Sequence, residues 1–223
     1  MALTAANVIT RAQDLLQDAT GVRWAEAELL RYLNDGRREL CIFRPDLYAI
    51  TYVLSMAAGT RQEIPADGSR FMDAIRNVNA DNSVGRAVRL IEREILDAQN
   101  PNWHSTAAGV IRHFMFDERT PRTFYVYPPA ANAQKLEIAY SKSPVDISNT
   151  STELTQEDVY AHGLVDYVLY RAFSKDAEFA GNAERAALHY RQFTTLAATG
   201  SGITSVVSPN TFNDGGKPPR TVQ

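Results

Sequence analysis

The sequence contains very little cysteine, because Cys41 is the only one among its 223 residues. A single chain can therefore form neither an internal disulfide nor a zinc site built from several cysteines. It also has no apolar run approaching about 18 residues and no basic start followed by a continuous apolar stretch. We therefore expect a soluble protein without a membrane span, made in a reducing compartment.

The sequence also lacks an excess of charge of either sign. It has 26 acidic residues against 23 lysines and arginines, which gives a net charge of −3. This balance provides no overall attraction to nucleic acid or to an anionic membrane. The 44% of hydrophobic and 22% of charged residues are typical of a globular chain and exclude gross disorder. The length is enough for one or two domains.

Motifs that carry catalytic chemistry in their spacing are absent as well. The sequence has no glycine-rich phosphate loop, no HExxH, no GxSxG and no paired CxxC. Its four histidines never lie three or four residues apart, so no helix presents two imidazoles to one metal ion. We expect no enzymatic activity, no metal and no cofactor.

Two groups of polar residues remain as weak candidates for chemistry. His162 and Asp166 lie four residues apart on one predicted helix, where a hydrogen bond between them is possible. Paired carboxylates among Glu92, Glu94 and Asp97 can in principle hold a divalent cation or cleave a glycosidic bond. The second group keeps a carboxylate-dependent hydrolase open as an alternative. Because arginines are interleaved with these acids, a salt-bridged surface segment is favoured instead.

The N-terminal part of the chain is predicted to be helical. Apolar residues recur at spacings of three and four over residues 8–19, with Thr4 available as the cap. A second helix is expected over residues 24–43, where Pro45 ends it. Gly36 lies inside that helix and indicates the close approach of a neighbouring backbone.

The middle of the chain changes to the period of strands. Short segments rich in aromatic and β-branched residues alternate with turn formers, and a brief helix is possible over residues 91–99. The clearest pair is VIRHFMF and TFYVY, which six residues separate as in a hairpin, with Pro128 and Pro129 ending the second strand. The predicted strands cover residues 48–56, 87–92, 110–116, 123–127 and 136–140.

The helical period returns after Thr155. The stretch VYAHGLVDYVLYRAF is apolar on nearly every side, so it needs cover on more than one side. The core and a last helix, which begins at Ser174, cover two sides, and we assign the remainder to a partner subunit. The candidate interface residues are Tyr160, Leu164, Tyr167 and Tyr170.

The last 25 residues have the composition of a tail. Four glycines and three prolines follow Ala198, which we take as too many for the helix to continue. A purely solvating tail has no need of apolar residues, so we predict an extended segment that docks onto a partner. The candidate docking residues are Ile203, Val206, Val207 and Phe212.

Five phrases in this order resemble the adaptor, or head-to-tail connector, proteins of tailed bacteriophages. The resemblance runs from about residue 23 to residue 193 and is carried by RWAEAELLRYLNDGRREL, EIPADGSRFMDAIRNV, GRAVRLIEREILDAQNPNWH, FDERTPRTFYVYPP and DVYAHGLVDYVLYRAFSKDAEFAGNAERAALHYRQF. It implies a helical bundle with an inserted β-rich region, assembled in the host cytoplasm as a ring, commonly of twelve copies. In the virion neck that ring would lie under the portal, give tail or nozzle proteins a surface to build on, and continue the DNA channel.

We therefore predict an α+β structural protein of the phage neck. A single adaptor domain, residues 1–198, would combine helices at 1–45 and 153–198 with a β-rich insertion at 46–150, and an extended tail at 199–223 would dock onto the portal. Residues 153–197 hold seven acids and four lysines or arginines. Such a surface, facing the channel, would let DNA slide without sequence-specific binding. Another neck protein, a tail-completion or stopper protein, is the alternative within the virion.

Overall fold

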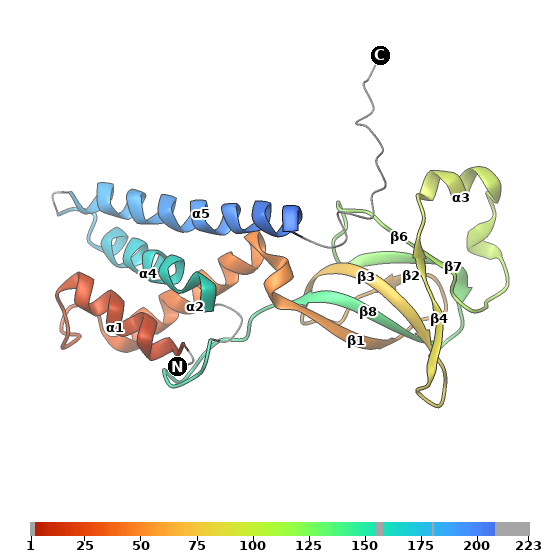
Figure 1. The fold of residues 1–223 in the computed structure, drawn as a ribbon, viewed down its shortest axis with the longest axis horizontal. Coiled ribbons are helices and arrows are strands. Elements are labelled where there is room, and N and C mark those ends of the chain that lie inside the picture. The colour runs from red at the N-terminus through yellow and green to blue at the C-terminus, as the bar shows by residue number, and fades with distance from the viewer. Residues whose placement is uncertain (1–2, 155–157, 180, 208–223) are drawn as a thin grey trace, which may run out of the picture. The chain divides into compact units, whose positions relative to one another are not determined.

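The computed structural model describes residues 3–154, 158–179 and 181–207, with side chains up to Thr199. The chain divides into two compact units (Figure 1). One unit combines Met1–Arg44 with Val145–Gln223, and the other is Pro45–Pro144. The first is helical and the second is built from strands, so the structure has the mixed α and β character expected from the sequence.

The helical unit is organised around one central helix. Helix α4 (Ala161–Lys175) packs against α1 (Ala5–Leu16), α2 (Glu26–Phe43) and α5 (Asn182–Val207), as Figure 1 shows. Thr4 caps α1 as predicted: its hydroxyl accepts from the Asn7 N–H, and the Asn7 side chain accepts from the Thr4 N–H. The helix ends at Leu16, earlier than predicted, because Gln17 adopts a left-handed conformation with φ of 55°.

A return segment, residues 145–154, connects the strands back to the helices. It runs along α2, where the Asn34 side chain accepts from the Ile147 N–H and donates to the Ile147 carbonyl. It also satisfies the first N–H groups of α1, because Ala5 and Ala6 donate to the carbonyls of Thr152 and Thr150. The segment therefore belongs to the helical unit, and the insertion ends at Pro144, earlier than the predicted residue 150.

The strand unit contains two sheets. The first has the order β1-β8-β3-β4 and is antiparallel throughout; the second has the order β2-β7-β6-β5, with only β5 and β6 parallel. Side chains of both sheets form one core, in which the Phe71 and Phe124 rings stack with their centroids 4.2 Å apart. The strands are β1 (Ala49–Ser55), β2 (Gly59–Glu63), β3 (Gly68–Val78), β4 (Val84–Ala87), β5 (Arg89–Leu90), β6 (His113–Phe116), β7 (Thr123–Ala130) and β8 (Lys135–Lys142).

The predicted hairpin is present as β6 and β7, paired from His113 with Tyr127 to Phe116 with Phe124. However, β7 does not end at Pro128, as the sequence predicted, but continues to Ala130. Pro128 and Pro129 lie beyond the last pair with β6 and inside a register shift against β2. No ladder hydrogen bond needs their missing N–H groups there, so the prolines are tolerated.

Three strands escaped prediction, namely β2, β3 and all of β4 except Ala87. In β3 the buried residues recur every third position, at Gly68, Phe71, Ala74 and Asn77. Three register shifts against β8 each add one residue between these positions. The bulges therefore replace the period of two by which a strand is recognised in a sequence.

A small third layer covers the outer face of the second sheet. It consists of α3 (Arg93–Gln99), close to the predicted short helix, and the 3₁₀ turn η2 (Trp103–Ser105). Leu96 and Trp103 bury themselves there against Met115 of β6 and against Tyr125 and Tyr127 of β7. None of the described helices combines the length and apolar character needed to cross a membrane.

The end of the last helix differs from the prediction. Helix α5 continues to Val207, whereas the sequence predicted an extended tail from residue 199. Glycine weakens a helix by about 1 kcal/mol but keeps its N–H, whereas proline removes it. Gly200 and Gly202 are therefore accommodated, and the first proline after Ala198 is Pro209. Residues 208–223 lie outside the described part of the chain.

Candidate docking surfaces

The four predicted interface residues lie on α4 or directly before it. Leu164 is fully buried, and Tyr160 and Tyr167 are only 7% and 4% exposed. Tyr170 is half-buried and packs against Tyr167 and Tyr190. All of these contacts come from the same chain, since α4 lies between α5 and the α1–α2 pair (Figure 1). The chain's own helices therefore bury the face of α4 that the sequence analysis assigned to a partner subunit, and a subunit contact at these residues stays a prediction.

The close approach of α2 and α4 explains how this cover is achieved. A Cβ placed on Gly36 would lie 2.8 Å from Cδ1 of Tyr167, closer than two such carbons can approach. Gly36 therefore makes room for an aromatic ring, not for a neighbouring backbone as the sequence indicated. The Tyr167 ring then packs edge-on against Phe193 of α5, 5.0 Å between centroids.

Hydrogen bonds complete the packing around these tyrosines. The Tyr190 hydroxyl donates to Oε1 of Glu39 over 2.7 Å. Burial, followed by the nearby Glu39 carboxylate, raises the pKa of Tyr167. Tyr160 is held by Arg44, whose guanidinium donates to its hydroxyl and lies 5.3 Å from the ring centre. These side chains fasten α4 inside its own unit.

A second polar group links α2 to the end of α4. Glu28 accepts from the Tyr32 hydroxyl at 2.6 Å and from the Lys175 ammonium at 2.9 Å. Burial and then the Glu28 hydrogen bond raise the pKa of Tyr32 to about 12. The hydrogen bonds from Tyr32 and then Lys175 lower the pKa of Glu28. The stability that these contacts contribute is therefore lost in acid, where Glu28 is protonated, and in alkali, where Tyr32 is ionised.

The predicted docking residues of the tail fall in two places. Ile203, Val206 and Val207 belong to α5 by their backbone, and their side chains lie outside the description. Phe212 lies outside the described residues. The backbone of the first three is helical, which differs from the extended conformation predicted for them, and their docking stays a prediction.

The polar candidates are arranged differently from the prediction. Asp166 does not pair with His162, which is exposed, but with Nδ1 of His189 on α5 at 2.8 Å. The His189 ring also stacks against Phe173, with centroids 5.7 Å apart. The pair therefore joins α4 to α5, a contact that spacing along one helix cannot reveal.

The central carboxylates are not brought together. Asp97 accepts from Nε1 of Trp103 at 2.7 Å and from Nε of Arg93 at 3.2 Å, while Glu92 and Glu94 are exposed. Within the described residues, no three histidine, cysteine or acidic side chains are placed to hold a metal ion. The geometry therefore lends no support to the hydrolase alternative.

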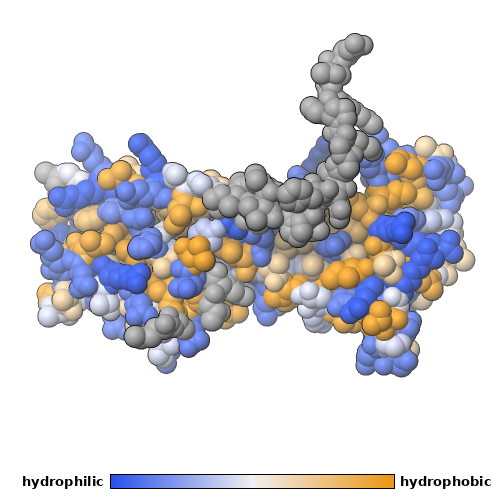
Figure 2. All heavy atoms as spheres, in the orientation of Figure 1, coloured by the Kyte–Doolittle hydropathy of each residue, from blue (hydrophilic) through white to orange (hydrophobic). Residues whose placement is uncertain are grey.

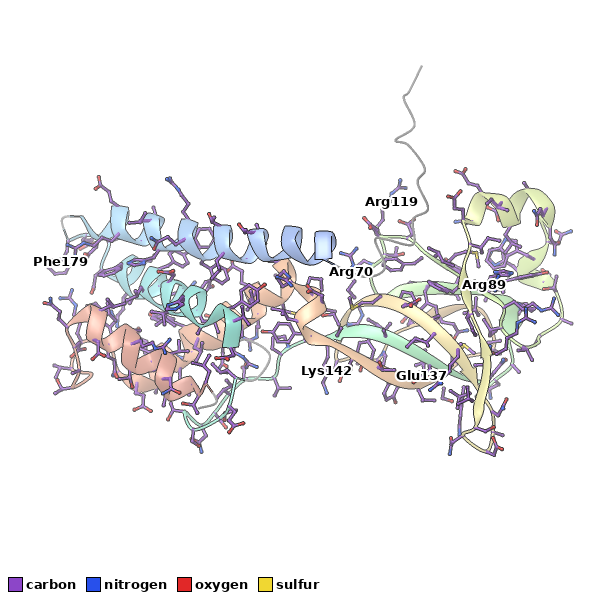
Figure 3. All side chains as sticks on the ribbon, viewed as in Figure 1. Arg70, Arg89, Arg119, Glu137, Lys142 and Phe179 are labelled. Carbon is purple, nitrogen blue, oxygen red and sulfur yellow. The ribbon has the colours of Figure 1, made fainter. Side chains whose placement is uncertain are left out.

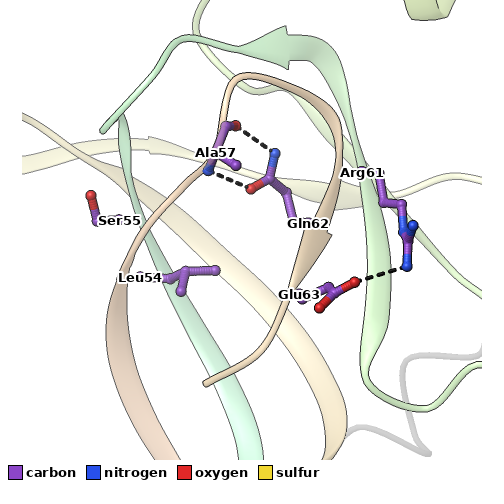
Figure 4. Close-up of a pocket in the computed structure, with 6 residues that line it drawn as sticks. All are labelled: Leu54, Ser55, Ala57, Arg61, Gln62 and Glu63. Carbon is purple, nitrogen blue, oxygen red and sulfur yellow. Dashed lines mark hydrogen bonds and ion pairs between the residues drawn. The ribbon is translucent and has the colours of Figure 1, made fainter. Parts of the chain in front are cut away.

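One cavity of the strand unit, of about 390 Å³, lies where β1 turns into β2 (Figure 4). Its central polar side chain is Gln62, whose amide accepts from the Ala57 N–H and donates to the carbonyls of Ala57 and Gly59. Arg61 and Glu63 pair with each other at 2.8 Å. The Gln62 amide is therefore engaged in holding the turn between β1 and β2, and this role is structural.

The helical unit presents an exposed apolar tip that the sequence analysis missed. Val22, in the turn that joins α1 to α2, is 87% exposed. Phe179, in the turn that joins α4 to α5, is 59% exposed (Figure 3). The first turn is held by the Asp18 carboxylate, which accepts from three successive N–H groups, those of residues 22–24. Arg23 joins the turns, since it pairs with Asp176 at 2.7 Å and lies 4.7 Å from the Phe179 ring centre. Elsewhere on the face shown in Figure 2, apolar and polar side chains are intermixed.

Comparison with known protein families identifies the chain. The family described as SU10 adaptor protein matches residues 3–211, which include both units. The chain belongs to the SU10 adaptor protein family. This is a phage head-to-tail adaptor family, so the match confirms the resemblance found in the sequence. The search of curated proteins gives no match.

Membership in the SU10 adaptor family gives the chain a structural role in the neck of a tailed phage. The family match spans the inserted strands as well as the helices, so the insertion is part of the adaptor architecture. The structure adds which surfaces this adaptor has available. Helix α4, which the sequence analysis chose as an interface, is largely buried. The apolar tip of Val22 and Phe179 and the edge strand β1 are exposed.

Proposed function

We propose that this adaptor assembles as a ring, of twelve copies, beneath the portal of a DNA-filled phage head. The ring joins head to tail, carries tail or nozzle proteins, and continues the channel through which the genome passes. The observation that carries the proposal is the family match over residues 3–211. Rings are built by heterologous contacts, in which one surface of a copy meets a different surface of the next.

The contacts of that ring fall on side chains that the single chain leaves exposed. Tyr160, Leu164 and Tyr167 are occupied inside the helical unit, and of the four predicted residues only Tyr170 reaches the surface in part. The tip formed by Val22 and Phe179 is a better candidate for a contact with a neighbour or with the portal. Its two turns are fixed by Asp18 and Arg23, so little ordering is required on binding.

The direct test is to mix the purified chain with purified portal particles and image the product by electron microscopy. We expect a second ring stacked coaxially on the portal. A portal that stays bare would contradict the proposal. A ring that forms only on a different neck component would instead support a tail-completion or stopper position.

The end of the chain is proposed to hold the adaptor on the portal. Deletion of residues 200–223 removes the last turns of α5 and everything that follows. We expect the truncated protein to keep its fold, measured by circular dichroism, and to lose portal binding in the imaging experiment. Unchanged binding would refute a role for this segment.

The acidic surface of the last two helices is proposed to keep DNA mobile in the channel. Residues 153–197 hold seven acids against four lysines or arginines, and Glu178 and Glu184 are exposed. Each neutralised phosphate adds affinity, so lysines at these two positions would hold the DNA. We expect Glu178→Lys with Glu184→Lys to slow DNA ejection from particles. An unaltered ejection rate would place this surface away from the channel.

A further inference from the structure

Three of the four edge strands in the inserted unit are protected against pairing with another chain. β4 is four residues long, carries Arg86 and follows a register shift. β2 carries the charged pair Arg61 and Glu63 and is also shifted in register, and β5 has only two residues. Short length, charge and bulges are the features by which proteins prevent sheets from joining edge to edge.

The fourth edge strand, β1, has none of these features. Its seven residues, AITYVLS, include no charge and no proline. It pairs with β8 residue by residue, from Ala49 with Ser141 to Ser55 with Lys135, without a bulge. Tyr52 is 46% and Val53 43% exposed, although both are large and apolar. β1 is therefore an uncharged edge of regular register with exposed apolar side chains.

Alternate residues of β1 bond to β8, and the residues between them direct their backbone N–H and carbonyl groups to the open edge. The Met56 N–H donates to the Gln134 carbonyl, and the Met56 carbonyl accepts from the Ala133 N–H. Because the direction alternates along a strand, Leu54 and Tyr52 bond to β8 in the same way. Thr51 and Val53 then direct their N–H and carbonyl groups to the open side, where no other strand of the described sheet lies.

We propose that β1 pairs with β1 of a second copy of this chain, antiparallel, about a twofold axis at Tyr52. Tyr52 then meets Tyr52 of the partner subunit in a non-hydrogen-bonded pair. Thr51 and Val53 of one copy meet Val53 and Thr51 of the other in hydrogen-bonded pairs, which matches the outward phase. The two four-stranded sheets become one continuous sheet.

The choice of a second copy as occupant follows from the residues of β1. Read against itself in this register, the strand opposes Ile50 to Leu54, two apolar side chains of equal size, and Thr51 to Val53, two β-branched side chains of similar size. No like charges meet anywhere along the edge. A twofold contact closes after two copies, so it belongs to the free protein and differs from the head-to-tail contact of a ring. The inference is independent of the proposed function.

A charge-pattern experiment tests the register. In Thr51→Lys with Val53→Lys, every cross-strand pair at these positions becomes Lys opposite Lys, and we expect the dimer Kd to rise about tenfold or more. In Thr51→Lys with Val53→Glu, each Lys meets a Glu, and the dimer returns. Val53 lies beside Glu137 of the same chain, so fold stability alone would favour Lys over Glu at position 53. Dimerisation is expected to favour Glu over Lys at position 53, which is the reverse of the preference from fold stability. A dimer that returns in the Lys–Glu variant therefore reports the pairing of β1 with β1.

The measurement is the molar mass from light scattering across a dilution series, with Ala87→Lys on β4 as the matched control that leaves the mass unchanged.

A disulfide provides an independent reading: Tyr52→Cys, in a Cys41→Ala background, places two thiols opposite each other at about 4.5 Å between Cα atoms, within the range that a disulfide spans. We expect a covalent dimer on mild oxidation. A wild-type chain that stays monomeric, or a dimer indifferent to both charge patterns, overturns the proposal.

Discussion

Gly36 and Gly163 show how the same residue has different roles at two helix interfaces, that of α2 with α4 and that of α4 with α5. A Cβ on Gly36 would press on Cδ1 of Tyr167 at 2.8 Å, whereas one on Gly163 would meet Cδ2 of Leu196 at 2.9 Å. Tyr167 is 4% exposed and has nowhere to move, while Leu196 is 37% exposed and has freedom to turn away. The tolerance of the neighbour, not the distance, decides the effect of added volume.

We expect Gly36→Ala to destabilise the protein by about 1–3 kcal/mol, since overpacking outweighs the better helix propensity of alanine. Gly163→Ala, the matched control, should leave stability unchanged within about 0.5 kcal/mol or increase it. Denaturant unfolding followed by circular dichroism measures both. Equal losses in the two variants would show that the Tyr167 ring is not the rigid partner.

Tyr32 is expected to make stability depend on pH in the alkaline range. Its pKa rises from the ordinary 10 to about 12 in the folded protein. A raised pKa stabilises the fold below the unfolded value, and this contribution is lost as pH rises from about 10 to about 12. Tyr32→Phe should therefore flatten the stability profile across that window in unfolding measurements. A mutant profile as steep as that of the wild type would contradict the assignment.

At the scale of elements, the return segment shows how a stretch without regular structure is fixed. Asn34 is 7% exposed, and its side chain donates to the Ile147 carbonyl at 3.0 Å and accepts from the Ile147 N–H at 2.9 Å. Arg37 adds a donor to the Val145 carbonyl at 2.7 Å. Side chains of α2 thus form the hydrogen bonds to the backbone of this segment that a neighbouring strand would form in a sheet.

We expect Asn34→Ala to destabilise the protein by about 2–3 kcal/mol, because it leaves a buried N–H and a buried carbonyl without partners. Asn79→Ala, an exposed asparagine that bonds to Ser83, serves as the control and should change stability by less than about 0.5 kcal/mol. Unfolding curves, together with faster hydrogen exchange at the Ile147 amide, check the prediction. Slow hydrogen exchange retained at the Ile147 amide of the variant would show that the Asn34 side chain does not hold the return segment in place.

At the scale of the whole molecule, the insertion has the properties of a domain of its own. It enters and leaves the helical unit at Pro45 and Pro144, and its core is formed between its own two sheets. Residues 45–144 hold as many acids as lysines and arginines, so the surplus of acids belongs entirely to the helical unit. The two units thus differ in charge as well as in secondary structure.

We expect residues 45–144, expressed alone, to fold into the same two sheets. The reason is that the buried side chains Phe71, Phe124 and Tyr140 find their contacts within this range. A β-type circular dichroism spectrum and a single cooperative unfolding transition would support independence. A fragment without a cooperative transition would show that the helical unit is needed for folding.

The sequence by itself determined the helical start and end of the chain with strands between them, the Thr4 cap, the β6–β7 hairpin and the family, because these depend on local spacing and on phrases along the chain. It did not determine what covers α4, the spacing of buried residues in β3, or the partner of Asp166. Those features depend on residues distant in sequence that only folding brings together: Gly36 beside Tyr167, the bulges against β8, and His189 on α5. Local periodicity records which side of a segment is apolar, whereas tertiary packing decides which neighbour covers it.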